Sequence, residues 1–309
     1  MHARSALFDL YGDHLRARGD VAPVAALVRL LAPLDIAAPA VRTAISRMVR
    51  QGWLEPLRLP SGPGYAPTER ARHRLDDAAS RIYRTREEAW DGTWDLLVVE
   101  TPAHRSARDR VRSGLFFLGY APLSESTWIS PFRSAEVGEL LDGEQADWAR
   151  LQAHDERPVE RARTAWDLET LAASYVAWRR FADRLLAAPD THLSAIGRAG
   201  EDERAFAVRS VLLHEWRKFL FSDPGLPPEL LPADWVGHEA AAFFAEEAAR
   251  LLPAASRFVD SCLADPERPS DQSPAQIPDQ TTDQIPDQTS EQTPERASGR
   301  LDRSGVTRE

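Results

Sequence analysis

The segment from Pro39 to Pro67 constrains the fold most, because it joins the pattern of an amphipathic helix to the pattern of a β-hairpin. Proline is favourable at the first position of a helix, so a helix is predicted to begin near Pro39. At about 100° per residue its apolar residues share one narrow arc, and these are Val41, Ala44, Ile45 and Met48. The opposite arc contains no acid and consists of Arg42, Thr43, Ser46, Arg47 and Arg50.

A hairpin is predicted directly after this helix. Gly52 ends the helix, and residues 57–59 alternate in polarity as a strand does. The Pro- and Gly-rich residues 60–64 form a turn, and Tyr65–Pro67 can be a short return strand with proline at its end. Three more helices are predicted around this unit, over residues 5–18, 24–31 and 69–84.

The order helix, helix, basic helix, hairpin, helix is that of a winged helix, which predicts a DNA-binding domain over residues 1–90. Arginine can bond guanine edges or phosphates bidentately, and short hydroxyl side chains let the backbone come close. A basic helix face is by itself most often only solvated, and here the hairpin favours DNA. The predicted contacts are Arg42, Thr43, Ser46, Arg47 and Arg50 on the helix and Arg58, Ser61 and Gly62 on the wing.

The distribution of charge is compatible with a nucleic-acid partner despite a net charge of −10. Residues 1–90 carry 14 arginines and 10 acids, a net +4, whereas residues 265–309 carry 5 arginines and 10 acids, a net −5. Local patches decide phosphate contact, because charges are screened within about 8–10 Å at physiological salt.

The rest of the chain divides by pattern. Strand signals at Leu96–Val99 and Trp128–Ile129 flank a predicted helix over Ser106–Leu118, which indicates a small α+β domain over residues 91–158. Residues 159–264 are predicted to be nearly all helix, with proline-rich interruptions at 189–200 and 223–234. The fold class is therefore mostly α with a small α+β part.

The last 45 or so residues differ from all others. From Gln276 an eight-residue polar and acidic repeat with proline occurs twice. Such a segment buries too little apolar surface to offset its chain entropy, so residues 265–309 are predicted to be disordered. A partner-binding tail is the alternative.

The sequence also argues against several classes of protein. A single cysteine, Cys262, forms no internal disulfide and is interpreted as a packing residue, which indicates a reducing, cytoplasmic setting. No stretch approaches the roughly 18 apolar residues of a membrane span, and no signal peptide is predicted. The usual nucleotide-binding, hydrolase and zinc-site motifs do not occur, so no enzyme, metal or cofactor is expected.

Four segments resemble a known family. Val41–Leu54 resembles the recognition helix of the phenylacetic-acid-degradation repressor (PaaX) family, and Tyr65–Thr68 resembles its wing exit. Pro67 stands where that family has leucine, and we expect it to shorten the second wing strand. His214–Phe219 and the run from Asp223 to Gly237 resemble the family's C-terminal domain, so the resemblance covers roughly residues 4–264.

The resemblance implies a transcriptional regulator, a repressor, that binds operator DNA as a homodimer. It implies release from DNA by an aromatic acyl-CoA such as phenylacetyl-CoA, and a ferredoxin-like middle domain similar to small CRISPR-associated nucleases. An acyl-CoA needs an apolar slot and cations, and the candidate ligand-binding residues are His214, Trp216, Arg217, Lys218 and Trp235. The same residues can instead belong to the core and surface of a helical domain, which spacing alone does not decide.

Two other functions are weighed against this one. A metal-dependent nuclease in the middle domain would need an acidic residue near the first strand, and Asp95 is the nearby candidate. A lone carboxylate without partner ligands is more typical of a strand entry than of a metal site. The other alternative is a winged helix that packs against protein and leaves no sequence-specific DNA footprint.

Overall fold

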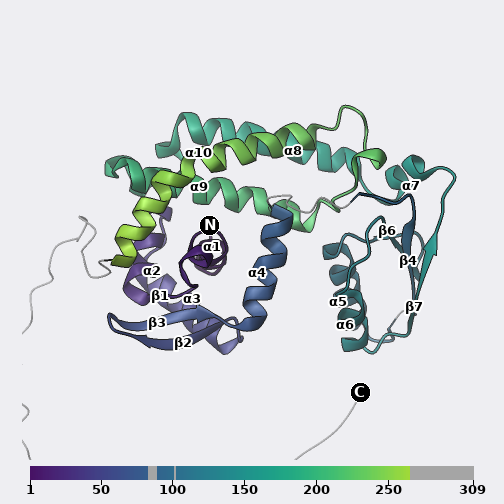
Figure 1. The fold of residues 1–309 in the computed structure, drawn as a ribbon, viewed down its shortest axis with the longest axis horizontal. Helices are drawn as coiled ribbons and strands as arrows, with labels where there is room; N and C mark the ends of the chain where they lie inside the picture. The colour runs from purple at the N-terminus through teal and green to yellow at the C-terminus, as the bar shows by residue number, and fades with distance from the viewer. Residues whose placement is uncertain (83–88, 101, 265–309) are drawn as a thin grey trace, which may run out of the picture. The chain divides into compact units, whose positions relative to one another are not determined.

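The structure is a computed structural model that describes residues 1–82, 89–100 and 102–264. Within these ranges the protein is mostly helical and contains two small antiparallel sheets (Figure 1). The mostly α prediction is thus confirmed. The predicted disordered tail, residues 265–309, lies outside the described residues.

The chain opens with three helical segments in the predicted places. The first consists of α1 (Ala3–Leu10), a π-helical turn (Tyr11–Leu15) and a 3-10 turn (Arg16–Arg18), and it ends at Gly19, which has a φ of 81°. The other two are α2 (Val24–Leu31) and α3 (Ala38–Arg50). The buried residues of α3 are Val41, Ala44, Ile45 and Met48, as the helical spacing predicts.

The hairpin after α3 consists of β2 (Leu54–Leu59) and β3 (Gly62–Pro67). A two-residue strand, β1 (Ala22–Pro23), pairs with the other side of β3 and was not predicted. The expected shortening by Pro67 is wrong, because Pro67 pairs with Leu54 at the end of a six-residue strand. Proline lacks an N–H, but the next residue, Thr68, continues the ladder by donating its N–H to the Trp53 carbonyl at 3.1 Å.

The helix after the hairpin, α4, spans Glu69–Ile82, and the last two residues of its predicted range lie outside the described residues. Thr68 fixes its start. The Thr68 hydroxyl donates to the Gly52 carbonyl at 2.8 Å and accepts from the N–H of Ala71 at 3.3 Å. A single side chain therefore joins the end of α3 to the start of α4.

The middle segment folds as β-α-β-β-α-β. Its elements β4, α5, β5, β6, α6 and β7 span Trp94–Val99, Arg105–Phe117, Ala121–Pro122, Thr127–Ser130, Val137–Gly143 and Trp148–Ala153. The strands lie in the order β5-β6-β4-β7, and each neighbouring pair is antiparallel. The sequence predicted β4, α5 and β6 but not β5, α6 and β7.

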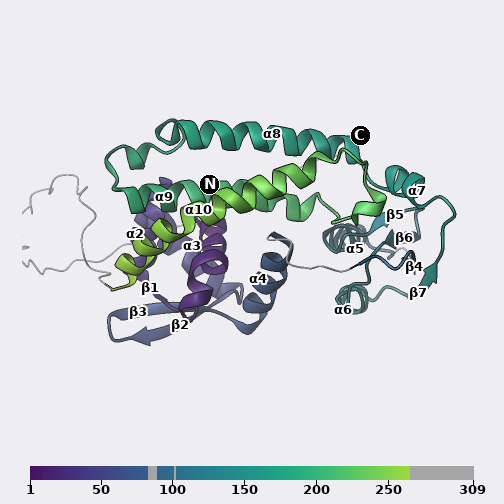
Figure 2. The same cartoon turned by 45° about the horizontal axis from the view of Figure 1, so that its top comes forward.

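The remaining helices, α7, α8, α9 and α10, span Pro158–Ala165, Leu168–Ala187, Glu201–Trp216 and Val236–Ala264. The three longest, α8, α9 and α10, pack side by side (Figure 2). The breaks between them include the two proline-rich segments, and their helical residues form only 3-10 turns. Residues 159–264 are thus helical with the predicted interruptions.

Hydrophobic cores extend across these sequence segments. One core joins α2 and α3 to α9 and α10 and includes Leu27, Val41, Phe206 and Cys262, and Cys262 is fully buried in it. Burial raises the pKa of that thiol, which agrees with its interpretation as a packing residue. A second core joins the C-terminal helices to Trp94 and Ile129 of the middle sheet.

Candidate DNA interface and ligand cavity

The predicted contact face of α3 is exposed along its length. Arg42, Thr43, Ser46, Arg47 and Arg50 all have exposed side chains, on the side opposite the buried stripe. The Thr43 hydroxyl donates to the Pro39 carbonyl at 2.8 Å, which leaves its lone pairs free to accept. The face thus presents three cations and two small hydroxyl groups.

The arginines of this face are not engaged by acids. Among the described residues, no carboxylate forms an ion pair with Arg42, Arg47 or Arg50. By contrast, Arg72 at the start of α4 lies 3.5 Å from Asp20 and 3.8 Å from Glu55. An arginine without an acidic partner keeps its five N–H donors available for phosphates or base edges.

The wing residues lie at the turn of the hairpin. Arg58 of β2 is exposed and pairs in register with Pro63 of β3, and Ser61 is exposed in the turn itself. Gly62 has a φ of 114°, a backbone region that a side chain rarely permits. The turn therefore exposes its backbone together with one arginine.

Trp53 joins α3 to the hairpin. The backbone N–H of Trp53 donates to the Met48 carbonyl at 2.9 Å, and the Trp53 carbonyl accepts from the backbone N–H of Thr68 where β3 ends. Its ring packs edge-on against Phe8 of α1, with centroids 5.3 Å apart, and the Arg70 guanidinium lies 4.7 Å from its centroid. Trp53 thus fixes the angle between α3 and β2.

Buried ion pairs connect α1 to α9 and the turn after it. Asp9 Oδ2 lies 2.7 Å from His214 Nδ1, and Asp9 Oδ1 lies 2.5 Å from Arg217 Nε. The Asp9 side chain is only 6 % exposed, so its charge depends on these two partners. The sequence named His214 and Arg217 as candidate ligand-binding residues, but did not predict that Asp9 holds both.

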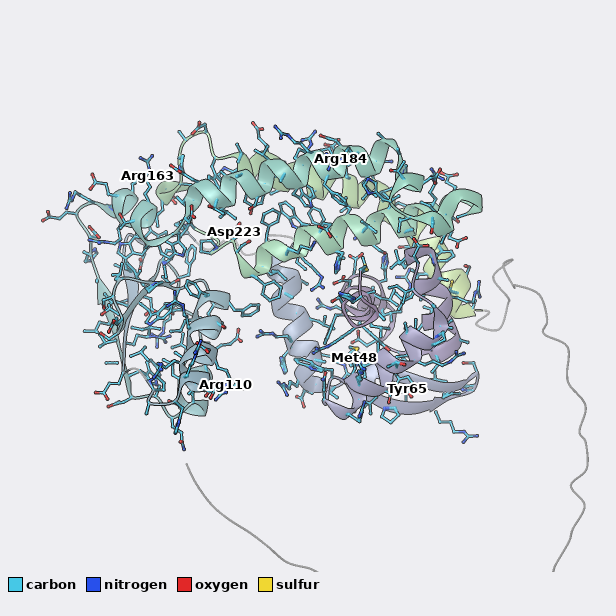
Figure 3. All side chains as sticks on the ribbon, turned by 180° about the vertical axis from the view of Figure 1, so that it is seen from behind. Met48, Tyr65, Arg110, Arg163, Arg184 and Asp223 are labelled. Atoms are coloured by element: carbon cyan, nitrogen blue, oxygen red, sulfur yellow. The ribbon has the colours of Figure 1, made fainter. Side chains whose placement is uncertain are left out.

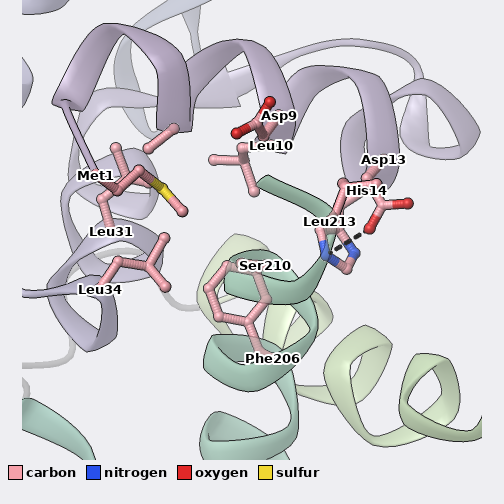
Figure 4. Close-up of a pocket in the computed structure, with 11 residues that line it drawn as sticks. Met1, Asp9, Leu10, Asp13, His14, Leu31, Leu34, Phe206, Ser210 and Leu213 are labelled. Atoms are coloured by element: carbon pink, nitrogen blue, oxygen red, sulfur yellow. Dashed lines mark ion pairs between the residues drawn. The ribbon is translucent and has the colours of Figure 1, made fainter. Parts of the chain in front are cut away.

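A second buried pair lies one turn further along the N-terminal helix. Asp13 accepts two hydrogen bonds from Arg209 of α9, at 2.7 and 2.9 Å, and both side chains are almost fully buried. His14 lies beside them, with Nε2 3.2 Å from Asp13 Oδ2 (Figure 4). Burial lowers the pKa of His14 from 6.5 to about 4, so the ring is neutral at physiological pH. The cavity at this point, next to Phe206, measures about 10 Å³ and is too small for an organic ligand.

A larger cavity of about 270 Å³ opens between α1, α4 and the turn after α9. Four aromatic rings line it, from Phe8, Trp53, Phe117 and Phe221, together with three cations, Arg4, Arg74 and Arg217. Asp9 and Asp13 also line it. Residues of the N-terminal, middle and C-terminal segments therefore form one cavity.

Of the five candidate ligand-binding residues, only Arg217 lines this cavity. Trp216 and Trp235 are buried in an aromatic cluster with Tyr175 and Phe244, and the Trp216 indole donates to the Ile82 carbonyl at 3.1 Å. His214 pairs with Asp9, and Lys218 is exposed and pairs with Glu215. The role of the five candidate residues in ligand binding stays a prediction.

The irregular run after α9 has a structural explanation. Asp223, which is labelled in Figure 3, accepts a hydrogen bond from the Tyr175 hydroxyl and another from the N–H of Gly225, the latter at 2.8 Å. Trp235 packs edge-on against Tyr175, and a Cβ at Gly237 would lie only 2.4 Å from its indole nitrogen. These residue types are needed to close the turn and start α10.

Asp95 occupies a polar cluster in the middle sheet. It is 6 % exposed, accepts a hydrogen bond from the Tyr120 hydroxyl, and lies 3.4 Å from Arg150 Nε. Burial and this hydrogen bond raise the pKa of Tyr120. In the part of the chain that the structure describes, no group of three or more His, Cys, Asp or Glu side chains is arranged to hold a metal ion.

Comparisons with known proteins cover almost all of the described chain. Residues 2–71 match the family described as PaaX-like protein, residues 87–161 the PaaX protein central Cas2-like domain, and residues 166–261 the PaaX-like protein C-terminal domain. Transcriptional repressor PaaX of Escherichia coli (strain K12) is 32% identical over 268 residues, 82% of each chain. The chain therefore belongs to the PaaX family.

A solved structure has a similar fold. Uncharacterized protein Rv0674 from Mycobacterium tuberculosis is 26% identical, with a TM-score of 0.52, over 84% of this chain and 98% of that one. Among the described residues, none of the helices has the length and hydropathy of a membrane span.

Several residues of the site escaped the sequence analysis. The larger cavity is lined by Arg4, Phe8, Asp9 and Trp53, and Asp13 holds α9, yet none of these was predicted to be a site residue. No pattern in the sequence marks Asp9, because at about 100° per residue it lies outside the apolar arc of Leu7, Leu10, Tyr11 and Leu15. Its burial is visible only in the fold, where a buried acid needs a cation from another segment.

Proposed function

We propose that this protein is an effector-responsive transcriptional repressor that binds operator DNA through a winged helix. In this proposal residues 1–90 form the DNA-binding domain, and α3 enters the major groove. Arg42, Thr43, Ser46, Arg47 and Arg50 contact bases and phosphates there, while Arg58, Ser61 and Gly62 meet the adjacent backbone.

The exposed arginine face of α3 carries this proposal. Its three arginines have no acidic partner among the described residues, whereas most of the other arginines located in helical segments form an ion pair with an acid. A solvated structural helix would gain stability from acids within three or four residues of these cations. Their absence favours a polyanionic partner, and the repressor name of the Escherichia coli relative supports the same partner.

The proposal also assigns roles to the middle and C-terminal segments. We propose a ferredoxin-like domain over residues 91–158, because its β-α-β-β-α-β order and antiparallel sheet suit that fold. Residues 159–264 would form the effector and dimer domain, and a cytoplasmic homodimer would match a two-fold operator. The proposed effector is an aromatic acyl-CoA such as phenylacetyl-CoA.

A binding assay with DNA from upstream of the protein's own gene tests the proposal. Fluorescence anisotropy should detect specific binding, and Arg42→Ala with Arg47→Ala should weaken it by about tenfold or more, since each lost base contact costs roughly 1–3 kcal/mol. The matched control is Arg163→Ala with Arg180→Ala, two exposed arginines of α7 and α8.

The control pair should retain wild-type affinity. Equal binding to unrelated DNA, or an affinity that the α3 double variant leaves unchanged, contradicts the proposed interface. Release of the DNA by phenylacetyl-CoA, measured in the same assay, tests the effector separately.

A further inference from the structure

The larger cavity has the size of a small aromatic group. Its volume is about 270 Å³, and an apolar cavity of about 150 Å³ is enough to hold benzene. One aromatic ring with a short acyl chain therefore fits inside. A group as large as a nucleotide has to remain outside the opening.

The lining favours an aromatic occupant. Phe117 and Phe221 lie with ring centroids 5.8 Å apart on one side, and Phe8 and Trp53 meet edge-on at 5.3 Å on another. The Phe221 side chain is 63% exposed, which is costly for so large an apolar residue unless something covers it. A ring placed between these pairs would make edge-to-face contacts and bury that surface.

The charges around the cavity favour an anion. Asp9 and Asp13 line it, but each is already paired with cations of α9 or of the turn after it. Among the described residues, no carboxylate pairs with Arg4, whose guanidinium lies 5.7 Å from the Phe8 ring centroid. Arg74 is exposed, places its guanidinium 3.9 Å from the Phe117 ring centroid and lies 3.6 Å from Glu136 Oε2. Arg4 therefore offers a cation beside the aromatic lining, where the anionic part of a ligand would emerge.

Trp53 connects the cavity to the candidate DNA interface. Its ring lines the cavity, while its backbone bonds to Met48 at the end of α3 and to Thr68 at the end of β3. A ligand that moves this ring shifts the junction from which both α3 and the wing extend. Leu213 and Arg217 also line the cavity, and Arg217 pairs with Asp9 of α1, so a ligand there also affects the contact of α1 with α9 and the turn after it.

We propose that this cavity is the effector site: it takes the aromatic acyl end of an anionic thioester, and Trp53 transmits occupancy to α3 and the wing. The inference rests on the proposed function for the class of effector and adds its location, its contact residues and its route to the DNA. Regulation follows if the ligand binds the conformers with two different Trp53 positions unequally.

Calorimetric titration of the full chain tests the site, with phenylacetyl-CoA, CoA alone and phenylacetate as separate probes. Ala79→Phe fills the cavity from α4, and Ala177→Phe adds the same ring to an exposed position of α8. The first variant should bind phenylacetyl-CoA about tenfold or more weakly, a loss near 1.4 kcal/mol, and should keep its DNA through the titration. The second should match the wild type in both.

A milder variant covers the case in which Ala79→Phe does not fold. Arg4→Gln removes an exposed cation, and we expect it to weaken phenylacetyl-CoA binding by about threefold to tenfold, because a charge-assisted contact is lost. Arg163→Gln is its control and should have no effect.

The possible outcomes distinguish a failure of the proposed cavity site from a failure of the proposed function. If the wild type binds the thioester and is released from DNA, but both cavity variants bind it with unchanged affinity, the site is overturned and the effector proposal stands. If the wild type binds DNA but none of the three probes, the site and the effector class both fail. If DNA is not bound at all, the proposed function fails, and the calorimetric comparison alone decides the site.

Discussion

Asp9 Oδ1 lies 2.5 Å from Arg217 Nε, and this contact ties the N-terminal helix to the turn after α9 across more than two hundred residues of sequence. Because Asp9 also pairs with His214, one carboxylate holds two side chains of the C-terminal segment in place.

Asp9→Asn should lower the free energy of unfolding by about 2–3 kcal/mol, because it leaves Arg217 and His214 near a neutral group in a largely buried place. Urea unfolding followed by circular dichroism measures the change. Asp234→Asn, at an exposed position before α10, is the control and should stay within about 0.5 kcal/mol of the wild type. Equal stabilities of the two variants would show that the Asp9 pairs contribute nothing.

The buried His14 should make stability depend on pH. Its pKa is about 4 when folded and 6.5 as its ordinary value, so the unfolded chain binds a proton more readily between these limits. The contribution of neutral His14 to the free energy of unfolding is complete above about pH 6.5. It is lost as the pH falls towards 4, so that the free energy of unfolding decreases by about 3 kcal/mol in total.

Substitution isolates the His14 effect from that of other groups. His14→Gln should flatten the fall in unfolding free energy between pH 6.5 and 4, whereas His73→Gln, at an exposed position of α4, should leave it as steep as in the wild type. Urea melts at several pH values provide the two slopes. Parallel curves for wild type and His14→Gln would mean that His14 protonates freely in the folded state.

Gly64 should tolerate no side chain. A Cβ there would lie 2.5 Å from Leu59 Cδ1 and 3.2 Å from the carbonyl oxygen of Ala22, where β1 meets β3. Gly64→Ala should therefore destabilise the protein by about 1–3 kcal/mol. Gly197→Ala meets open space and is the matched control. A thermal shift assay compares both, and an unchanged melting temperature for Gly64→Ala would show that neither Leu59 nor the Ala22 carbonyl limits the space at residue 64.

Arg58 and Arg47 should affect DNA binding in different ways. Arg58→Gln on the wing should weaken binding to all sequences alike and reduce the slope of log affinity against log salt by about 1, because it would remove the proposed phosphate contact. Arg47→Gln on α3 should reduce discrimination between the specific and an unrelated sequence. Anisotropy titrations at several salt concentrations distinguish them. A wing variant that alters specificity with an unchanged salt slope would contradict the placement of the hairpin beside the backbone.

The sequence was most informative where contacts are local. The spacing of Val41, Ile45 and Met48 predicted which face of α3 is buried, because a helix repeats on the scale of the pattern itself. Gly52 and the turn at residues 60–64 predicted the hairpin for the same reason. The two-residue strand β1 was missed, since a strand this short leaves no alternation to detect.

The sequence was least informative where distant segments meet. Asp9 and His214 are 205 residues apart, and no periodic pattern links them. Trp216 and Trp235 were candidates for a ligand slot, whereas the structure places them in a packed aromatic cluster. Spacing cannot separate these roles, because a tryptophan that lines a cavity and one that fills a core occupy the same helix positions. The candidate cavity instead depends on Phe8, Trp53 and Phe221, which no motif connects.

The core that joins α2 and α3 to α9 and the end of α10 limits how this protein can be divided. A fragment ending near residue 90 would lose Leu193, Phe206, Val259 and Cys262, the residues that cover the inner side of the first three helices. Exposed apolar faces of this kind favour aggregation. A chimera that transfers the DNA specificity of α3 to another regulator should therefore exchange only the exposed residues of that helix, rather than the whole N-terminal segment.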